Sequence, residues 1–141
     1  MVYEGERRYD LVVHMTGKGA DNSFRGLTDT PVFQAYSLDG KFLWEINLGK
    51  NVREGAHYTQ FLVYDLDQDG KAEIVMKTAD GSKDGKGKLI GDPTKNYVNE
   101  NGMILSGAEY MTVFDGLTGA EIHTVNYEVP RFAGNLNPTD E

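Results

Sequence analysis

Carboxylate side chains alternate along one short segment of the chain, between residues 65 and 73. Asp65, Asp67 and Asp69 occupy every second position, Gly70 follows them, and Glu73 closes the segment. Ca²⁺ prefers six to eight oxygen ligands in a flexible geometry, and glycine permits the sharp turn that gathers them. The pattern predicts a Ca²⁺-binding loop whose ligands are the side chains of Asp65, Asp67, Asp69 and Glu73 and the backbone carbonyl of Lys71.

Two other interpretations of this segment are an EF-hand and a simple acidic turn. An EF-hand requires a bidentate Glu at its twelfth position and flanking helices, but the twelfth position here is Met76 and strands flank the segment. A solvated acidic turn that only closes a hairpin remains an alternative. We favour Ca²⁺ because the alternation, the glycine and the final carboxylate occur together.

Histidine and tryptophan supply the other candidate chemistry. His57 lies among small residues directly before a predicted strand, so it is a candidate metal ligand or proton-transfer group, or a structural histidine. His14 and His123 fall within strand patterns, and we expect both to pack rather than react. Trp44 could stack on a sugar ring, but aromatic residues on hairpin strands usually belong to the core.

A second group of oxygen-bearing side chains lies between residues 79 and 108, a stretch rich in Gly, Lys, Asp and Asn. These side chains could hold another cation or a polar ligand. Because turns favour Asp and Asn in any case, we expect a solvated loop. The residues concerned are Asp80, Asp84, Asp92, Asn96, Asn99 and Asn101.

The elements that must position these residues are β-strands. Short apolar runs bounded by Gly, Asp and Asn recur, and no stretch of a dozen residues has convincing helical periodicity. We therefore predict an all-β fold in which Gly-containing turns at 36–41 and 114–120 join antiparallel neighbours. The expected strands cover residues 9–15, 32–37, 42–47, 59–64, 73–77, 109–114 and 122–127.

The two halves of the chain resemble each other. Residues 8–13 match residues 71–76, and a strand–turn–strand unit at 34–44 matches one at 112–123, with an insertion in the second copy at 79–108. Small repeated sheets suggest propeller blades, of which four to eight are needed for closure. The chain is therefore predicted to be a fragment, although a stand-alone sandwich of the same strands remains an alternative.

Composition excludes several classes of function. Acidic residues outnumber basic residues by 22 to 14, and the sequence pI is about 4.8, so we expect no nucleic acid and no membrane partner. Cysteine is absent, which excludes disulfides and thiolate chemistry. No apolar run could span a bilayer, and we expect no signal peptide in this chain. Phosphate-binding and nucleophile-elbow motifs are also absent.

One long motif resembles a known family. The run from Trp44 to Asp67, its continuation over 77–81, and the segments 90–92 and 105–116 resemble the family 11 polysaccharide lyases, the rhamnogalacturonan lyases. The resemblance implies an eight-bladed, Ca²⁺-binding β-propeller that cleaves rhamnogalacturonan I, a pectic polysaccharide, by β-elimination. It also implies an extracellular or periplasmic parent protein. Residues 1–141 would form a partial propeller domain, with blade one at about 6–50 and blade two at about 57–128.

The same resemblance implies roles for individual residues. It places His57 at the cleft as a Ca²⁺ ligand or a close neighbour, and it assigns the loop at 65–73 to a structural ion. Arg53 and Lys77 are further candidates for the base, although a cationic side chain must first lose its own proton. Ca²⁺ on the galacturonate carboxylate would stabilise the charge that develops when the C5 proton is removed.

Two functional hypotheses follow. The chain is a segment of a rhamnogalacturonan endolyase and is inactive alone, or it is a non-catalytic, calcium-stabilised β module that binds carbohydrate or protein. In either case, isolated blades with open sheet edges expose unpaired backbone groups, so self-association is an expected property of the chain.

Overall fold

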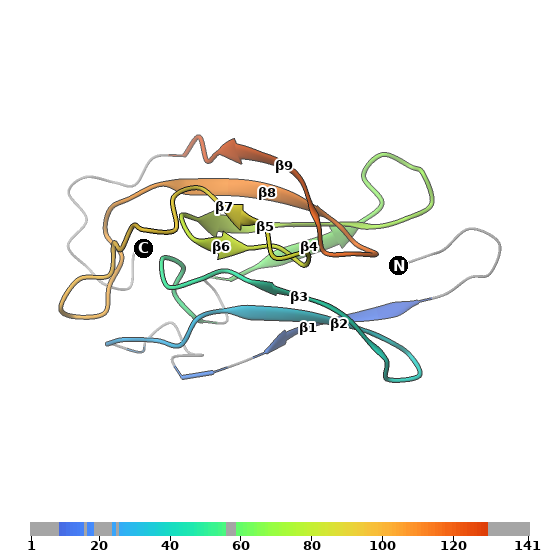
Figure 1. Ribbon diagram of the computed structural model, residues 1–141, viewed down its shortest axis with the longest axis horizontal. Helices are drawn as coiled ribbons and strands as arrows, with labels where there is room; N and C mark the ends of the chain where they lie inside the picture. The colour runs from blue at the N-terminus through green and yellow to red at the C-terminus, as the bar shows by residue number, and fades with distance from the viewer. Residues whose placement is uncertain (1–8, 16, 19–23, 25, 56–58, 130–141) are drawn as a thin grey trace.

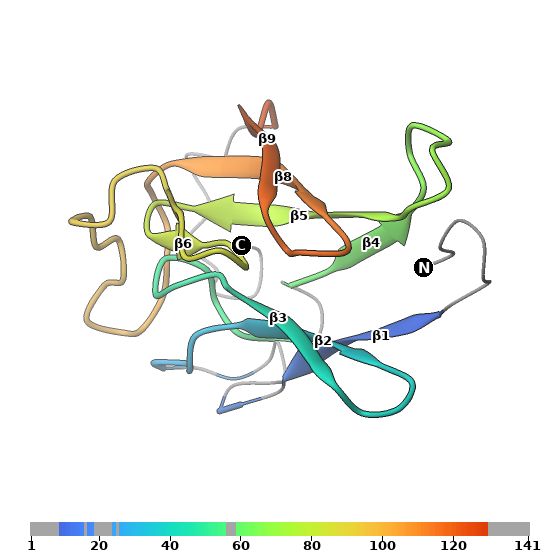
Figure 2. The ribbon, with the colours of Figure 1, turned by 45° about the vertical axis from the view of Figure 1, so that its right-hand side comes forward.

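The computed structural model describes residues 9–15, 17–18, 24, 26–55 and 59–129. These residues form two antiparallel β-sheets, which lie as two layers in Figures 1 and 2. The all-β prediction is confirmed. In this part of the chain, no helix is long and apolar enough to cross a membrane.

The first sheet has the strand order β1-β2-β3-β6-β7. Its β2–β3 hairpin turns at Gly40, which has a positive φ of 85°. The third strand then meets β6 through the pair Asn47 and Lys83. The strands are β1 (Asp10–Met15), β2 (Val32–Ser37), β3 (Phe42–Asn47), β6 (Ser82–Lys83) and β7 (Leu89–Ile90).

The second sheet has the order β4-β5-β8-β9, with each strand antiparallel to its neighbour. The predicted acidic loop joins its first two strands, and the predicted turn after Phe114 joins its last two. The strands are β4 (Phe61–Tyr64), β5 (Glu73–Ala79), β8 (Glu109–Asp115) and β9 (Glu121–Asn126).

An apolar core lies between the sheets, because alternate side chains of each strand point to the same face. Phe33 and Ile46 from the first sheet and Ile74 and Phe114 from the second are all fully buried. Trp44 is also buried, as expected, and its Nε1 donates a hydrogen bond to the Gly116 carbonyl oxygen at 2.9 Å. That bond ties the two sheets together.

The turn between β8 and β9 depends on glycine. Gly119 has a φ of 68°, and a Cβ there would lie 2.9 Å from the Trp44 ring. A side chain at this position would therefore combine an unfavourable backbone conformation with a steric clash. The turn closes over the indole and covers the core at this end.

The expected strands are all present, with ends that differ by up to two residues from the prediction. The largest differences are at β4, which begins at Phe61 rather than residue 59, and at β5, which extends to Ala79. Residues 79–108 were expected to be a solvated loop, and that expectation is wrong. They contain β6 and β7, and they bury Ile90, Met103 and Ile104. Strands of two residues are too short to produce an alternating pattern.

Candidate cation site

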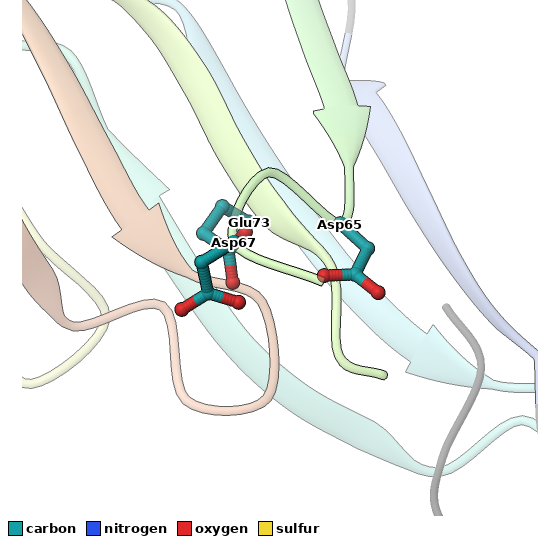
Figure 3. A group of neighbouring side chains, drawn as sticks. All are labelled: Asp65, Asp67 and Glu73. Carbon is teal, nitrogen blue, oxygen red and sulfur yellow. The ribbon is translucent and has the colours of Figure 1, made fainter. Parts of the chain in front are cut away.

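The acidic loop connects two paired strands of the second sheet. Tyr64 at the end of β4 pairs with Glu73 at the start of β5, so the intervening residues must reverse direction within a short span. Gly70 (φ 90°) and Gln68 (φ 65°) both adopt the left-handed conformation. That tight turn brings residues 65 and 67 back towards the first residue of β5 (Figure 3).

Three of the predicted ligands converge. Asp65, Asp67 and Glu73 each offer a carboxylate oxygen, and these oxygens all lie within 4.8 Å of one another. Oxygens 2.3–2.6 Å from a shared Ca²⁺ would be separated by at most about 5 Å. The spacing therefore fits one cation held between the three carboxylates. Among the described residues, this is the one such group of acidic or histidine ligands.

Backbone N–H groups hold these carboxylates in place. Asp65 accepts hydrogen bonds from the amides of Asp69 (3.1 Å) and Gly70 (3.0 Å), and Glu73 accepts one from the amide of Leu66 (2.8 Å). Asp67 also accepts from the Asp69 amide at 3.0 Å. Neutral donors orient the oxygens without cancelling their charge, so a cation would relieve the repulsion between them.

The fourth predicted carboxylate points elsewhere. Asp69 Oδ1 accepts a hydrogen bond from the Lys71 amide at 2.8 Å, and its Oδ2 lies 3.3 Å from Lys71 Nζ. The Lys71 backbone hydrogen bond is the main cause of the lowered pKa of Asp69. Coordination by Asp69 would require its side chain to turn away from this lysine. The Lys71 carbonyl as a ligand stays a prediction.

The predicted catalytic residues fall into two groups. His57 lies outside the described residues, so its role as a cleft histidine stays a prediction. Arg53 is buried, and its guanidinium donates to the carbonyl oxygens of Phe24 and Gly102, each at 2.7 Å. Lys77 Nζ lies 2.9 Å from a carboxylate oxygen of Glu109. Both cations are thus engaged in structural contacts.

The carboxylate of Asp80 stabilises the fold through hydrogen bonds rather than facing a ligand. It accepts hydrogen bonds from Tyr97 Oη (2.7 Å), Tyr110 Oη (2.9 Å) and the Asp92 amide (2.8 Å). Burial alone would raise the pKa of Asp80, but these hydrogen bonds outweigh it and the net pKa is lowered. The residue is 5% exposed, so it forms part of the packed structure.

Asp84 is used in the same way. Its Oδ1 accepts from the amides of Lys86 (2.9 Å) and Lys88 (2.8 Å), and its Oδ2 accepts from the amide of Glu121 (2.9 Å). The other turn residues between 92 and 99 also accept from nearby backbone amides, through the oxygens of Asp92, Asn96 and Asn99. Among the described residues, none of these carboxylates belongs to a second group of converging metal ligands, so the structure gives no support for a second cation site here.

One polar pair was not expected from the sequence. His14 Nε2 lies 2.9 Å from Glu54 Oε2, although the two residues are 40 positions apart. We had expected His14 only to pack within a strand. A strand pattern shows which face a side chain occupies but not which distant residue it meets, so the sequence contains no signal for this contact.

The fold and the site together define an all-β protein in which a β-strand connection presents an acidic group suited to a cation. The chain belongs to rhamnogalacturonan lyase family 11. The family model described as "Rhamnogalacturonan lyase family 11, C-terminal domain" matches residues 2–137. The resemblance noted in the sequence is thereby confirmed.

Two curated relatives come from Bacillus subtilis (strain 168). The chain is 56% identical to the rhamnogalacturonan exolyase YesX over 129 residues, which is 91% of this chain and 21% of that protein. It is 55% identical to the rhamnogalacturonan endolyase YesW over 135 residues, 95% of this chain and 22% of that protein. The chain therefore spans about a fifth of the length of these relatives.

Solved structures agree with the sequence relatives. A Bacillus licheniformis rhamnogalacturonan lyase PL11 superposes with a TM-score of 0.87 at 58% identity, covering 91% of this chain and 22% of that one. The exotype rhamnogalacturonan lyase YesX gives a TM-score of 0.87 at 56% identity, covering 91% and 21% of the two chains. The two-sheet arrangement thus occurs within much larger proteins.

Proposed function

We propose that this chain is a segment of a calcium-dependent lyase that cleaves rhamnogalacturonan I by β-elimination, and that the chain alone does not turn over substrate. Membership of rhamnogalacturonan lyase family 11 is the observation that carries this proposal. The chain covers about a fifth of its curated relatives, so the rest of the active cleft would come from other parts of the parent protein.

The exposed faces of the sheets support a larger assembly. On β1, Leu11, Val13 and Met15 point away from the core and are 52%, 39% and 43% exposed. Contiguous apolar surface of this kind is uncommon on a soluble monomer and marks an interaction face. We propose that the two sheets are adjacent blades of a propeller and that this face packs against a further blade of the parent.

We assign the acidic loop to Ca²⁺ rather than Mg²⁺. Its oxygens come from carboxylates on a tight, irregular turn, and Ca²⁺ accepts such geometry whereas Mg²⁺ demands a near-ideal octahedron and retains several waters. Asp65 and Asp67 in the turn and Glu73 on β5 would hold the ion. Bound there, it would neutralise the converging carboxylates and fix the β4–β5 connection.

The substrate also suggests where the parent acts. Rhamnogalacturonan I is a polymer that cannot cross a membrane intact, so we place the parent protein outside the cytoplasm. Fractionation of producing cells followed by immunoblotting with an antibody against this chain tests that placement. Signal only in the cytoplasmic fraction would contradict it.

Turnover tests the proposal directly. The full-length protein that contains this chain and the isolated chain should each be incubated with rhamnogalacturonan I, with Ca²⁺ or with excess chelator. We expect the full-length protein with Ca²⁺ to release products with ultraviolet absorbance from the new C4=C5 bond, and the isolated chain to release none. Ca²⁺ binding without turnover by the full-length protein would favour the non-catalytic module instead.

The relatives bear both endolyase and exolyase names, so the cleavage mode needs its own measurement. An endolyase, as the sequence interpretation has it, would lower the viscosity of the polymer early, when few bonds have been broken. A viscosity that falls only in proportion to product release would indicate exolytic cleavage.

A further inference from the structure

Glu54 is a buried carboxylate whose hydrogen bonding is incomplete. The residue is buried, and its Oε1 has no hydrogen-bond partner among the described residues. Its Oε2 lies 2.9 Å from His14 Nε2. Burying a carboxylate with an unused oxygen is costly, so this position calls for a role beyond packing.

The contact with Glu54 assigns a role to each nitrogen of His14. When Glu54 is ionised its carboxylate only accepts hydrogen bonds, and Nε2 is then the donor to it. Thr59 Oγ1 lies 3.4 Å from the same nitrogen, and its hydroxyl donates a hydrogen bond to the Gly55 carbonyl oxygen at 2.8 Å. Because the hydroxyl hydrogen is used in that bond, Oγ1 faces the imidazole as an acceptor. In the neutral ring, Nδ1 therefore presents a lone pair, and no described group hydrogen-bonds to it.

The imidazole is also held in one plane. It stacks on the fully buried Phe33 ring with centroids 4.6 Å apart and an interplanar angle of 13°. The side chain of His14 remains 16% exposed, whereas that of Glu54 is 1% exposed. A buried carboxylate thus orients a histidine that still reaches the surface, which is the arrangement of a histidine–carboxylate general base.

Arg53 and Lys77, the two cationic side chains that the sequence analysis named as candidate bases, are poorly placed to accept a proton. Arg53 stays charged in proteins, and its guanidinium donates to backbone carbonyls in the interior. Lys77 is paired with Glu109. Of these three side chains, His14 alone has a ring nitrogen that can accept a proton together with a neighbouring carboxylate that would stabilise the protonated ring.

We propose that His14 is a proton acceptor in the lyase reaction and that Glu54 is its positioning residue; this rests on the proposed function. Nδ1 would take the C5 proton of galacturonate, and the C5–H electron pair would form the C4=C5 bond. The C4–O bond would break, and the leaving oxygen would take a proton from water. The imidazolium would then return its proton to solvent.

The test uses the full-length protein and rhamnogalacturonan I. We expect His14→Ala to lower kcat by about 100-fold or more, the typical contribution of general acid–base catalysis, with little change in KM. Added imidazole should restore part of the lost kcat, which a purely structural histidine would not allow. His123→Ala, on the exposed face of β9, is the matched control and should leave kcat unchanged.

Glu54→Gln tests the positioning role. It should lower kcat in the native background but cause no further loss in the His14→Ala background, because Glu54 acts through the imidazole. If the double variant shows the product of the two single fold-losses in kcat, the two residues act independently and the inference that Glu54 works through His14 is overturned. If His14→Ala fails to fold in a thermal scan, His14→Gln replaces it, since it keeps an N–H for Glu54 but cannot accept the proton.

The outcomes separate this inference from the function it rests on. An active unsubstituted enzyme whose kcat is unaffected by His14→Ala or by His14→Gln would overturn the inference alone. Loss of kcat in a folded His14→Ala variant that imidazole does not rescue, with His14→Gln fully active, would also overturn it. No turnover by the unsubstituted full-length protein would overturn the proposed function and this inference together.

Discussion

The loop at 65–73 and the segment at 80–108 contain the same kinds of side chain but use them in opposite ways. In the loop, three carboxylates turn towards one another within 4.8 Å. In the segment, each buried carboxylate accepts several hydrogen bonds from protein donors, as Asp80 does from two tyrosines and an amide. The carboxylate oxygens of the loop thus lie close enough for one cation to contact all three, whereas those of the segment form hydrogen bonds that stabilise the segment itself.

The difference lies in whether the carboxylates converge rather than in the number of acidic residues, since among the described residues only the loop brings three of them together. Tyr97 and Tyr110 bring hydroxyl groups to Asp80, and the turn between the short strands β6 and β7 brings the amides of Lys86 and Lys88 to Asp84. In the loop, backbone amides bind carboxylates whose oxygens lie close to one another. We therefore expect substitutions in the segment to affect stability without metal, and substitutions in the loop to matter only when Ca²⁺ is present.

Asp80→Ala should have the largest effect. It leaves two tyrosine hydroxyls and the Asp92 amide without their acceptor, and the expected loss is about 3 kcal/mol of unfolding free energy. Urea unfolding in excess chelator measures it. Asp92→Ala, in the same segment but at the surface, is the control and should cost much less. Equal losses for the two variants would contradict the role given to Asp80.

Asp84→Asn should have an intermediate effect. An amide can accept through only one atom, so either the Lys86 and Lys88 amides or the Glu121 amide would lose its partner. We expect a loss of about 1–2 kcal/mol, measured by urea unfolding without metal. A variant as stable as the original chain would show that these hydrogen bonds contribute little.

Tyr110→Phe should cost about 1 kcal/mol at neutral pH and should change the alkaline behaviour. Burial, together with the hydrogen bond to Asp80, raises the pKa of Tyr110 from 10.0 to about 12. The folded state then holds this proton more tightly than the unfolded state does. The resulting stability is complete below about pH 10 and is lost as the pH rises towards 12.

Unfolding free energies measured at several pH values between neutrality and pH 12 check this prediction. The original chain should lose stability more steeply than Tyr110→Phe above pH 10. Parallel curves for the two proteins would mean that Tyr110 titrates alike in the folded and unfolded states.

Asp67→Asn should have the smallest effect on stability in chelator. Its side chain belongs to the exposed turn, and removing one of three neighbouring charges relieves repulsion. We expect a melting temperature equal to or slightly above that of the original chain. In added Ca²⁺ the order should reverse, because only the original chain gains stability from binding. A clear loss in chelator would mean that the loop carboxylates already stabilise the metal-free fold.

Dilution of the isolated chain tests the exposed faces. If Leu11, Val13 and Met15 on β1 normally face another blade, the chain should self-associate at high concentration. Light scattering across a dilution series should show a mass that falls towards that of the monomer. A constant monomer mass would contradict the proposal that this face is an interface.

Sequence patterns identified the parts of the molecule that depend on local chemistry. Alternating apolar residues located the long strands, and alternating carboxylates with Gly70 located the turn in which three acidic side chains converge, because each signal lies within a few consecutive residues. The remaining features depend on distant contacts. Neither the burial of Asp80 by Tyr110 nor the pairing of His14 with Glu54 leaves a local pattern, since each joins residues 30 or more positions apart.

The direction in which each side chain of the loop points could not be predicted from the sequence either. The alternation assigned Asp69 to the same group as Asp65 and Asp67, yet its carboxylate turns to Lys71. The competition between a cation and a neighbouring lysine depends on loop conformation, which spacing alone does not specify.

Isothermal titration of the chelator-treated chain with Ca²⁺, repeated on Asp67→Ala, tests the central claim most directly. Circular dichroism should first show that both proteins are folded. We predict saturable binding at one site in the original chain, loss of that binding in Asp67→Ala, and much weaker binding of Mg²⁺. A folded original chain that does not bind Ca²⁺, or an Asp67→Ala variant that binds it equally well, would contradict the assignment of this loop.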